Sequence, residues 1–209
     1  QSPQIFKQIL MIGGFDRYYQ IARCFRDEDL RADRQPEFTQ VDMEMSFVEE
    51  DDVMNTIEEL ISKALKDAVG VSIKTPIRRL SYAEAKQRYG SDRPDLRIKT
   101  ELFDASQVFA NTKFERFKVN VASGGVVKGL VHKGGAQFSR KEVDDLTKFA
   151  QSVGAKGLAW LKVAAEGKVE SPIAKFLDPA EIDEVRKISG ADVGDIIFMV
   201  SDKIKLTEN

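Results

Sequence analysis

The sequence predicts an α+β protein in two parts: a partial domain with an antiparallel sheet over residues 1–99, and a two-layer α/β domain with an antiparallel sheet over residues 100–209. Three observations support this prediction. Segments of helical periodicity and segments of strict alternation follow one another along the chain. Residues 37–47 alternate cleanly enough to indicate a strand with one apolar face. Near residue 100 the pattern changes, and a second series of strands and helices begins.

The composition limits the class of protein. Among 209 residues, 42% are hydrophobic and 32% are charged, which is the balance of a folded soluble protein. A chain of this length should bury roughly 70% of its unfolded surface without a disulfide or a metal. The net charge of -2 excludes a uniformly basic nucleic-acid coat. One Cys and one His exclude an internal disulfide and the usual zinc ligand sets, so we expect no metal site.

Hydropathy and the amino terminus indicate the compartment. No apolar run approaches the ~20 residues of a membrane span, and no signal peptide pattern is present. We therefore expect a cytoplasmic protein with no membrane contact. Gln1 stands directly on a helix-start signal with neither a leader nor an initiator Met, which suggests a piece cut from a longer chain.

The first elements predicted are a helix and a hairpin. Ser2 and Pro3 begin a helix that ends at Gly13, and its apolar stripe consists of Ile5, Phe6, Ile9 and Leu10. On the side away from that stripe lie Gln4 and Lys7. A strand over 17–26, a charged loop over 27–36 and a strand over 37–47 then predict a hairpin.

The second strand of this hairpin has a polar and an apolar face. The apolar face carries Thr39, Val41, Met43, Met45 and Phe47, and the opposite face carries Phe38, Gln40, Asp42, Glu44 and Ser46. A polar face on an antiparallel sheet often does no more than face water. Here Arg26 falls on the same face, and Lys7 joins it if the helix packs across. Side chains of opposite charge that converge on one face of the sheet suggest a binding surface for a polar ligand.

Two helices follow the hairpin. The first begins at Asp51 and ends at Gly70, and the second is capped by Ser81 with Glu84 and ends at Gly90. The longer helix has a stripe expected to be buried, made of Val53, Ile57, Leu60, Ile61, Ala64, Leu65 and Ala68.

After residue 100 the pattern predicts a sheet covered by helices on one face. Strands are expected over 114–122, 126–132, 157–165, 167–171 and 195–201, and helices over 140–153 and 179–189. The expected helix stripes are Val143, Leu146, Ala150 and Val153, then Ile182, Val185 and Ile188, with Phe149 and Trp160 also in the core. Gly124-Gly125 and Gly134-Gly135 lack the spacing of phosphate-binding loops and are expected to form hairpin turns, and His132 is expected to be structural or exposed.

Residues 25–44, FRDEDLRADRQPEFTQVDME, resemble motif 2 of the class II aminoacyl-tRNA synthetases, in the form typical of the bacterial aspartyl-tRNA synthetases. Residues 1–8, QSPQIFKQ, are similar to the aspartate-binding segment of that family, and residues 88–97, RYGSDRPDLR, to its lead into an inserted domain. From about residue 100 the chain resembles that insertion, the GAD domain. The resemblance covers essentially the whole chain and implies a fragment of an aspartate–tRNA ligase.

The resemblance implies a role for individual residues. Arg26 matches the catalytic arginine that contacts the α-phosphate of ATP and the reacting carboxylate, and Lys7 matches the cation for the side-chain carboxylate of aspartate. Phe38 matches the aromatic that stacks on adenine. Asp42 and Glu44 could also form a general acid/base pair, but the attacking carboxylate is already ionised and needs no base. The implied aspartate-binding residues are Ser2, Gln4, Ile5, Phe6, Lys7, Arg26, Gln40, Asp42 and Glu44, and the implied ATP-binding residues are Arg26, Asp27, Glu28, Gln35 and Phe38.

The resemblance also implies partners. The parent enzyme would use ATP as a substrate with Mg²⁺, join aspartate to the acceptor end of tRNA, and form a homodimer through a motif 1 that does not occur in residues 1–209. No motif 3 resemblance appears either, so we expect the Mg²⁺ ligands outside this chain and the isolated chain to be inactive. Two alternatives stay open: a noncatalytic tRNA-binding module, and an asparaginyl-type ligase.

Overall fold

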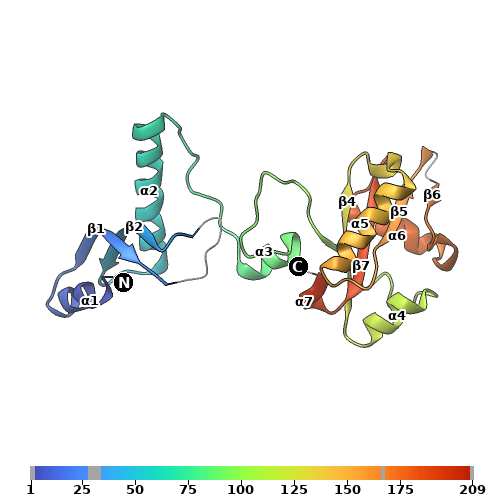
Figure 1. The fold of residues 1–209 in the computed structure, drawn as a ribbon, viewed down its shortest axis with the longest axis horizontal. Coiled ribbons are helices and arrows are strands. Elements are labelled where there is room, and N and C mark those ends of the chain that lie inside the picture. Colours follow the sequence, from blue (N-terminus) through green and yellow to red (C-terminus); the bar gives the residue numbers. More distant parts are fainter. Residues whose placement is uncertain (1–2, 28–33, 166–167, 208–209) are drawn as a thin grey trace. The chain divides into compact units, whose positions relative to one another are not determined.

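The computed structural model describes residues 3–27, 34–165 and 168–207. It confirms an α+β protein with antiparallel sheets. The chain forms two compact units, Gln1–Arg78 and Arg79–Asn209 (Figure 1). The expected boundary lies about twenty residues later, at 99/100. Helix α3 (Tyr82–Tyr89) belongs to the second unit because the Leu102 amide donates to the Arg88 carbonyl at 2.7 Å. The assignment of an inserted domain stays a prediction.

The first unit contains the predicted helix and hairpin. Helix α1 spans Gln4–Ile12, strand β1 Arg17–Phe25 and strand β2 Glu37–Met45, and the two strands pair antiparallel with Ile21 opposite Val41. This register places the predicted polar residues of both strands on one face. Strand β2 ends two residues before the predicted end. Phe47 adopts φ 57°, in the left-handed region, which an extended strand does not tolerate.

Helix α1 does not bury most of the apolar stripe that the sequence indicates. Ile5, Phe6 and Ile9 of this stripe are 69%, 72% and 58% exposed, whereas Leu10 is partly buried together with Lys7 and Met11. The Ser46 hydroxyl contacts the Met11 sulfur at 3.0 Å. Carboxylates on the hairpin compensate the Lys7 charge, so the polar side of the helix can dock.

Helix α2 (Glu50–Val69) follows the hairpin but has no buried residue. A reciprocal capping box between Glu49 and Asp52 begins it one residue before the predicted start, and Gly70 at φ 72° ends it as predicted. The expected burial of its stripe is wrong for the described part of the chain, since Leu60 and Ile61 are 43% and 41% exposed. Periodicity identifies the apolar side of a helix but not what covers it.

The second unit is built on a five-stranded antiparallel sheet in the order β3-β4-β7-β5-β6. The central strand β7 (Ile196–Asp202) pairs with β4 (Val126–His132) on one side and β5 (Ala159–Val163) on the other. The remaining elements are β3 (Phe103–Asp104), β6 (Val169–Glu170), α4 (Glu115–Ala122), α5 (Arg140–Ser152), α6 (Pro179–Ser189) and α7 (Ile204–Thr207).

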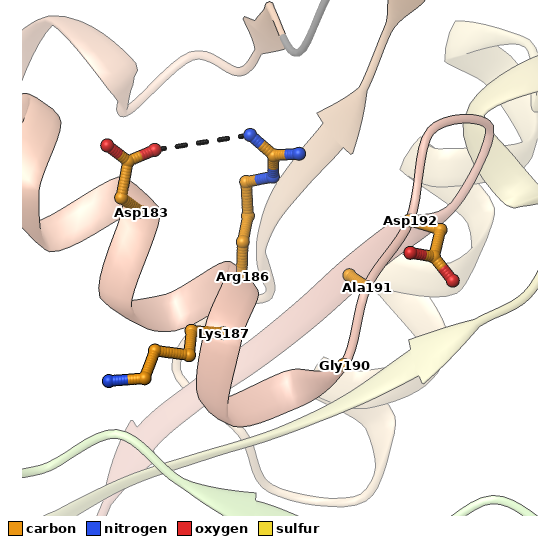
Figure 2. Close-up of a pocket in the computed structure, with 6 residues that line it drawn as sticks. All are labelled: Asp183, Arg186, Lys187, Gly190, Ala191 and Asp192. Carbon is orange, nitrogen blue, oxygen red and sulfur yellow. Dashed lines mark ion pairs between the residues drawn. The ribbon is translucent and has the colours of Figure 1, made fainter.

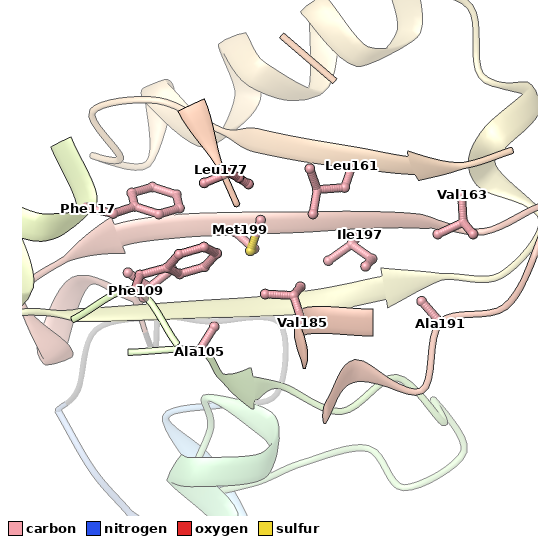
Figure 3. Packing of buried hydrophobic residues seen from close by; sticks show 11 residues of the cluster. Ala105, Phe109, Phe117, Leu161, Val163, Leu177, Val185, Ala191, Ile197 and Met199 are labelled. Atoms are coloured by element: carbon pink, nitrogen blue, oxygen red, sulfur yellow. The ribbon is translucent and has the colours of Figure 1, made fainter. Parts of the chain in front are cut away.

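Helices cover both faces of this sheet. Ile197 and Met199 of β7 pack on one face in a core that includes Phe117 of α4 and Val185 of α6 (Figure 3). The alternate residues of β7, Ile196 and Phe198, pack on the other face with Val143 of α5. The expectation of helices on one face only is therefore corrected. A central strand that is apolar on both faces requires a cover on each.

The predicted strand over 114–122 is wrong, because these residues form helix α4. Phe114, Phe117 and Val121 are spaced by three and four and pack in the same core, whereas Val119, which alternation would bury beside Phe117, is 61% exposed. The Asn120 amide then donates to Val126 O at 3.2 Å and Ser201 Oγ at 2.9 Å, which fastens the helix end to the sheet.

In the second unit, the predicted helix caps are confirmed, whereas two predicted core residues and the predicted hairpin turns are wrong. Helices α5 and α6 have their predicted caps at Ser139 and Asp178. Phe149 and Val153 are not in the core, being 67% and 58% exposed. Both glycine pairs lie in turns but neither joins two strands. Gly124-Gly125 leads from α4 to β4, and Gly134-Gly135 leads into a 3₁₀ turn. His132 is exposed and stacks on Phe138 with centroids 5.0 Å apart, as expected for a surface residue.

Candidate functional site

The polar face of the hairpin gathers three charged side chains. Asp42 and Glu44 are two residues apart in β2 and so point to the same face, and α1 brings Lys7 over them. Lys7 Nζ lies 2.9 Å from Asp42 Oδ1 and 3.3 Å from Glu44 Oε2. The side chains of Lys7 and Asp42 are each 12% exposed. One ammonium group is thus held between two carboxylates and largely shielded from water.

This environment fixes the charge of Lys7. The hydrogen bond to Asp42 raises the pKa of the ammonium group, burial opposes that rise, and Glu44 adds to it. Lys7 is therefore positive at neutral pH. Asp42 Oδ2 is buried with no hydrogen-bond partner among the described residues. A buried acceptor without a partner costs roughly 1–3 kcal/mol, so stability alone does not explain Asp42 at this position.

The same face continues toward the far end of the hairpin. Gln40 and Phe38 follow Asp42 at intervals of two residues, and the Arg26 amide donates to the Pro36 carbonyl at 2.9 Å just beyond β1. The Arg26 guanidinium carbon lies 5.1 Å from the centroid of the Phe38 ring, a cation–π contact. At about 3.3 Å per residue, Asp42 and Phe38 are roughly 13 Å apart along the strand. The face therefore has a cation at each end.

The other predicted residues lie at the edges of this face or outside the described chain. Gln4 is exposed on α1, and Asp27 and Gln35 are exposed at the two ends of the charged loop. Ile5 and Phe6 are 69% and 72% exposed on α1. Ser2 and Glu28 lie outside the described residues, as do Arg31 and Asp33 of the loop. The structure thus groups Lys7, Asp42 and Glu44, and aligns Gln40, Phe38 and Arg26 with them.

The sequence prediction assigned no role to Cys24. Its side chain is 0% exposed on the polar face, and its thiol lies 3.1 Å from Gln40 Oε1. Cys24 is two residues before Arg26, so strand alternation places both residues on this face. The sequence does not indicate which residue Cys24 contacts, because that depends on the register of the two strands.

The described ranges contain no cluster of three or more His, Cys, Asp or Glu side chains suitable for a metal ion, and no described helix is long and apolar enough to cross a membrane. The second unit has an open pocket of about 380 Å³ (Figure 2). Its lining carries both signs of charge. Arg186 Nη1 lies 4.0 Å from Asp183 Oδ1, and the other lining residues are Lys187, Gly190, Ala191 and Asp192. None of these residues belongs to the predicted site.

Comparison with known proteins gives one family. Residues 1–189 match the profile of tRNA synthetases class II (D, K and N). The chain is 51% identical over 99% of its length to an aspartate–tRNA(Asp/Asn) ligase of Persephonella marina, and 55% identical over 97% to one of Aquifex aeolicus. It is 53% identical over 97% of its length to an aspartate–tRNA ligase of Clostridium perfringens.

These alignments cover a limited part of the relatives. The matched region is 34% of the Persephonella marina protein, 33% of the Aquifex aeolicus protein and 34% of the Clostridium perfringens protein. The chain therefore spans about a third of the length of the curated relatives it matches.

Proposed function

Because the chain belongs to the class II tRNA synthetases of the D, K and N group, we propose that it forms the part of an aspartate–tRNA ligase that holds aspartate and ATP while aspartyl-adenylate forms. The relatives are named as aspartate–tRNA ligases, some with tRNA(Asp/Asn) as the acceptor. The observation that carries the proposal is the buried cation Lys7 between Asp42 and Glu44.

Lys7 is the proposed site for the side-chain carboxylate of aspartate. An ammonium group has three N–H donors, and the two carboxylates beside it leave one donor for a substrate oxygen. Asp42 and Glu44 hold the ammonium group in place and keep it charged. Selection follows from charge, because an uncharged asparagine amide gains less from this cation than a carboxylate does.

Arg26 is the proposed catalytic residue at the opposite end of the face. When the α-carboxylate of aspartate attacks the α-phosphorus of ATP, negative charge accumulates on the phosphoryl oxygens and pyrophosphate leaves. A guanidinium offers paired planar donors to such oxygens. Phe38, beside Arg26, supplies the aromatic surface for adenine. Asp27, Glu28 and Gln35 are proposed as further ATP contacts around it.

The remaining partners follow the same proposal. Class II aminoacyl-tRNA synthetases use ATP and Mg²⁺. We assign no Mg²⁺ ligand to this chain, and we propose that the complete enzyme is a homodimer that accepts the tRNA acceptor end. The aspartate contacts assigned to Ser2, Gln4, Ile5, Phe6, Gln40 and Glu44 are part of the proposal.

Pyrophosphate exchange into ATP tests the function. The complete enzyme that carries these residues should exchange labelled pyrophosphate when aspartate is supplied, and much less with asparagine or lysine. Faster exchange with asparagine would favour an asparaginyl-type ligase. Binding of tRNA with no exchange for any of the three amino acids would favour a noncatalytic module.

A further inference from the structure

Cys24 and Gln40 form a side-chain pair on the polar face of the hairpin. In the register of β1 and β2, Cys24 is opposite Phe38 and Ala22 is opposite Gln40, so Cys24 and Gln40 are diagonal neighbours. The Cys24 sulfur lies 3.1 Å from Gln40 Oε1 and 3.8 Å from the Ala22 carbonyl oxygen. A thiol has one hydrogen to donate, and the contact with Gln40 Oε1 is the shorter of the two.

The contact determines which end of the Gln40 amide faces the site. A thiol is a weak donor and its sulfur a weak acceptor. With Oε1 turned to the thiol, the two N–H groups of Gln40 are left for other partners. Cys24 is fully buried, so its thiol is shielded from water in this contact.

We propose that Cys24 is a positioning residue, whose thiol holds the Gln40 carboxamide so that its N–H groups face the reacting centre. This inference rests on the proposed function. Gln40 lies between Asp42, at the aspartate end, and Phe38, at the ATP end, about 7 Å from each along the strand. On the proposed function, the aspartate side chain binds at Lys7 and adenine binds at Phe38, so the α-carboxylate and the α-phosphate that Arg26 contacts lie between these two ends, beside Gln40. The oxygen atoms of these two groups need hydrogen-bond donors. A Gln40 carboxamide in the opposite orientation would turn its acceptor oxygen toward them instead of its two N–H groups.

The test compares three substitutions in the complete enzyme. Cys24→Ser keeps a hydrogen-bond donor, Cys24→Val keeps the apolar volume without a donor, and Cys24→Ala removes the donor without adding volume. The kcat/KM for aspartate in pyrophosphate exchange should fall about tenfold in the Val and Ala variants and stay within about twofold in the Ser variant. The KM for ATP should change less than kcat in every variant.

Further variants separate positioning from packing. In a Gln40→Met background, Cys24→Val should cause no further loss, because the group it positions is gone. Thr39→Val, on the opposite face of the same strand, controls for disturbance of the hairpin. Packing alone predicts that Val is tolerated better than Ser, which would overturn the role of Cys24, as would full activity of Cys24→Ala. Failure of the wild-type enzyme to activate aspartate would instead overturn the proposed function.

Discussion

Lys7 and Asp42, 35 residues apart in the sequence, form an ion pair of 2.9 Å in which each side chain is only 12% exposed. Burial makes this pair different from the exposed ion pairs elsewhere in the chain, such as Lys63–Asp67, whose side chains are 79% and 61% exposed. Exposed pairs contribute little to stability. Among the described residues, the second oxygen of the Asp42 carboxylate has no hydrogen-bond partner. The proposed role of Lys7 in aspartate binding leads to the first prediction.

Lys7→Met should weaken aspartate activation more than ATP binding. The substitution keeps an unbranched side chain that is one atom shorter and removes the charge, so kcat/KM for aspartate in pyrophosphate exchange should fall roughly 10- to 100-fold, as for a lost charge-assisted hydrogen bond. Lys63→Met, at the exposed pair, is the matched control and should leave the kinetics unchanged. An unaltered aspartate KM and kcat/KM in Lys7→Met would contradict the assigned role.

Arg26→Ala should slow the chemical step itself. Removing a donor that stabilises transition-state charge typically lowers kcat about 10²- to 10³-fold, and single-turnover measurement of adenylate formation would detect it. Arg26→Lys should recover little of the loss, because an ammonium group lacks the planar pair of donors. Arg23→Ala, at the exposed Arg23–Glu37 ion pair on the opposite face, should be near normal. Near-normal adenylate formation by Arg26→Ala would refute the assignment.

Asp195 should make the stability of the second unit depend on pH. Burial acts to raise the pKa of Asp195, but hydrogen bonds from the Lys133 ammonium and from the amides of Asp192 and Gly134 outweigh it and lower the pKa below 3.8. A carboxylate with a lowered pKa stabilises the fold above its unfolded pKa and loses that contribution as pH falls through the folded value. Urea unfolding should therefore show Asp195→Asn less stable by about 2–3 kcal/mol at pH 7, with the difference shrinking below pH about 4.

The control for this prediction is Asp145→Asn, at an exposed pair with Lys148. This substitution should change the free energy of unfolding by less than about 0.5 kcal/mol at pH 7 and at pH 3. A difference between wild type and Asp195→Asn that stays constant from pH 7 to pH 3 would mean that Asp195 stabilises the fold by some means other than its charge.

Gly129→Ala should destabilise the five-stranded sheet. A Cβ at Gly129 would come within 2.5 Å of the Phe198 carbonyl oxygen and 2.6 Å of Phe103 Cζ, closer than a Cβ atom approaches its neighbours in a packed core. Relieving this overlap requires movement between β3, β4 and β7, so we expect a loss of about 2–3 kcal/mol in thermal or urea unfolding. Gly157→Ala, with nothing within 4 Å of the added methyl group, serves as the control. Equal stability of the two variants would show that the sheet relaxes freely at Gly129.

Much of the hairpin and its polar face followed from local pattern. Alternation alone placed Gln40, Asp42 and Glu44 on one side, because a strand has a period of two wherever it lies. The docking of α1 did not follow, since its most apolar side is the exposed one and charge pairing with β2 sets its orientation. Helix α4 was missed for a related reason. The apolar residues of 114–122 fit alternation as well as helical spacing, and only the core on β7 distinguishes the two.

The strand register also limits how the length of this chain can vary among its relatives. Opposite residues in β1 and β2 are paired one to one from Arg17–Met45 to Phe25–Glu37. Deleting or adding a single residue within one strand would turn the following side chains of that strand to the other face. In β2, such a change before Val41 would bring Val41 to the face that holds Lys7. Length changes tolerated in evolution should therefore fall in residues 27–36 between the strands, or come in pairs within them.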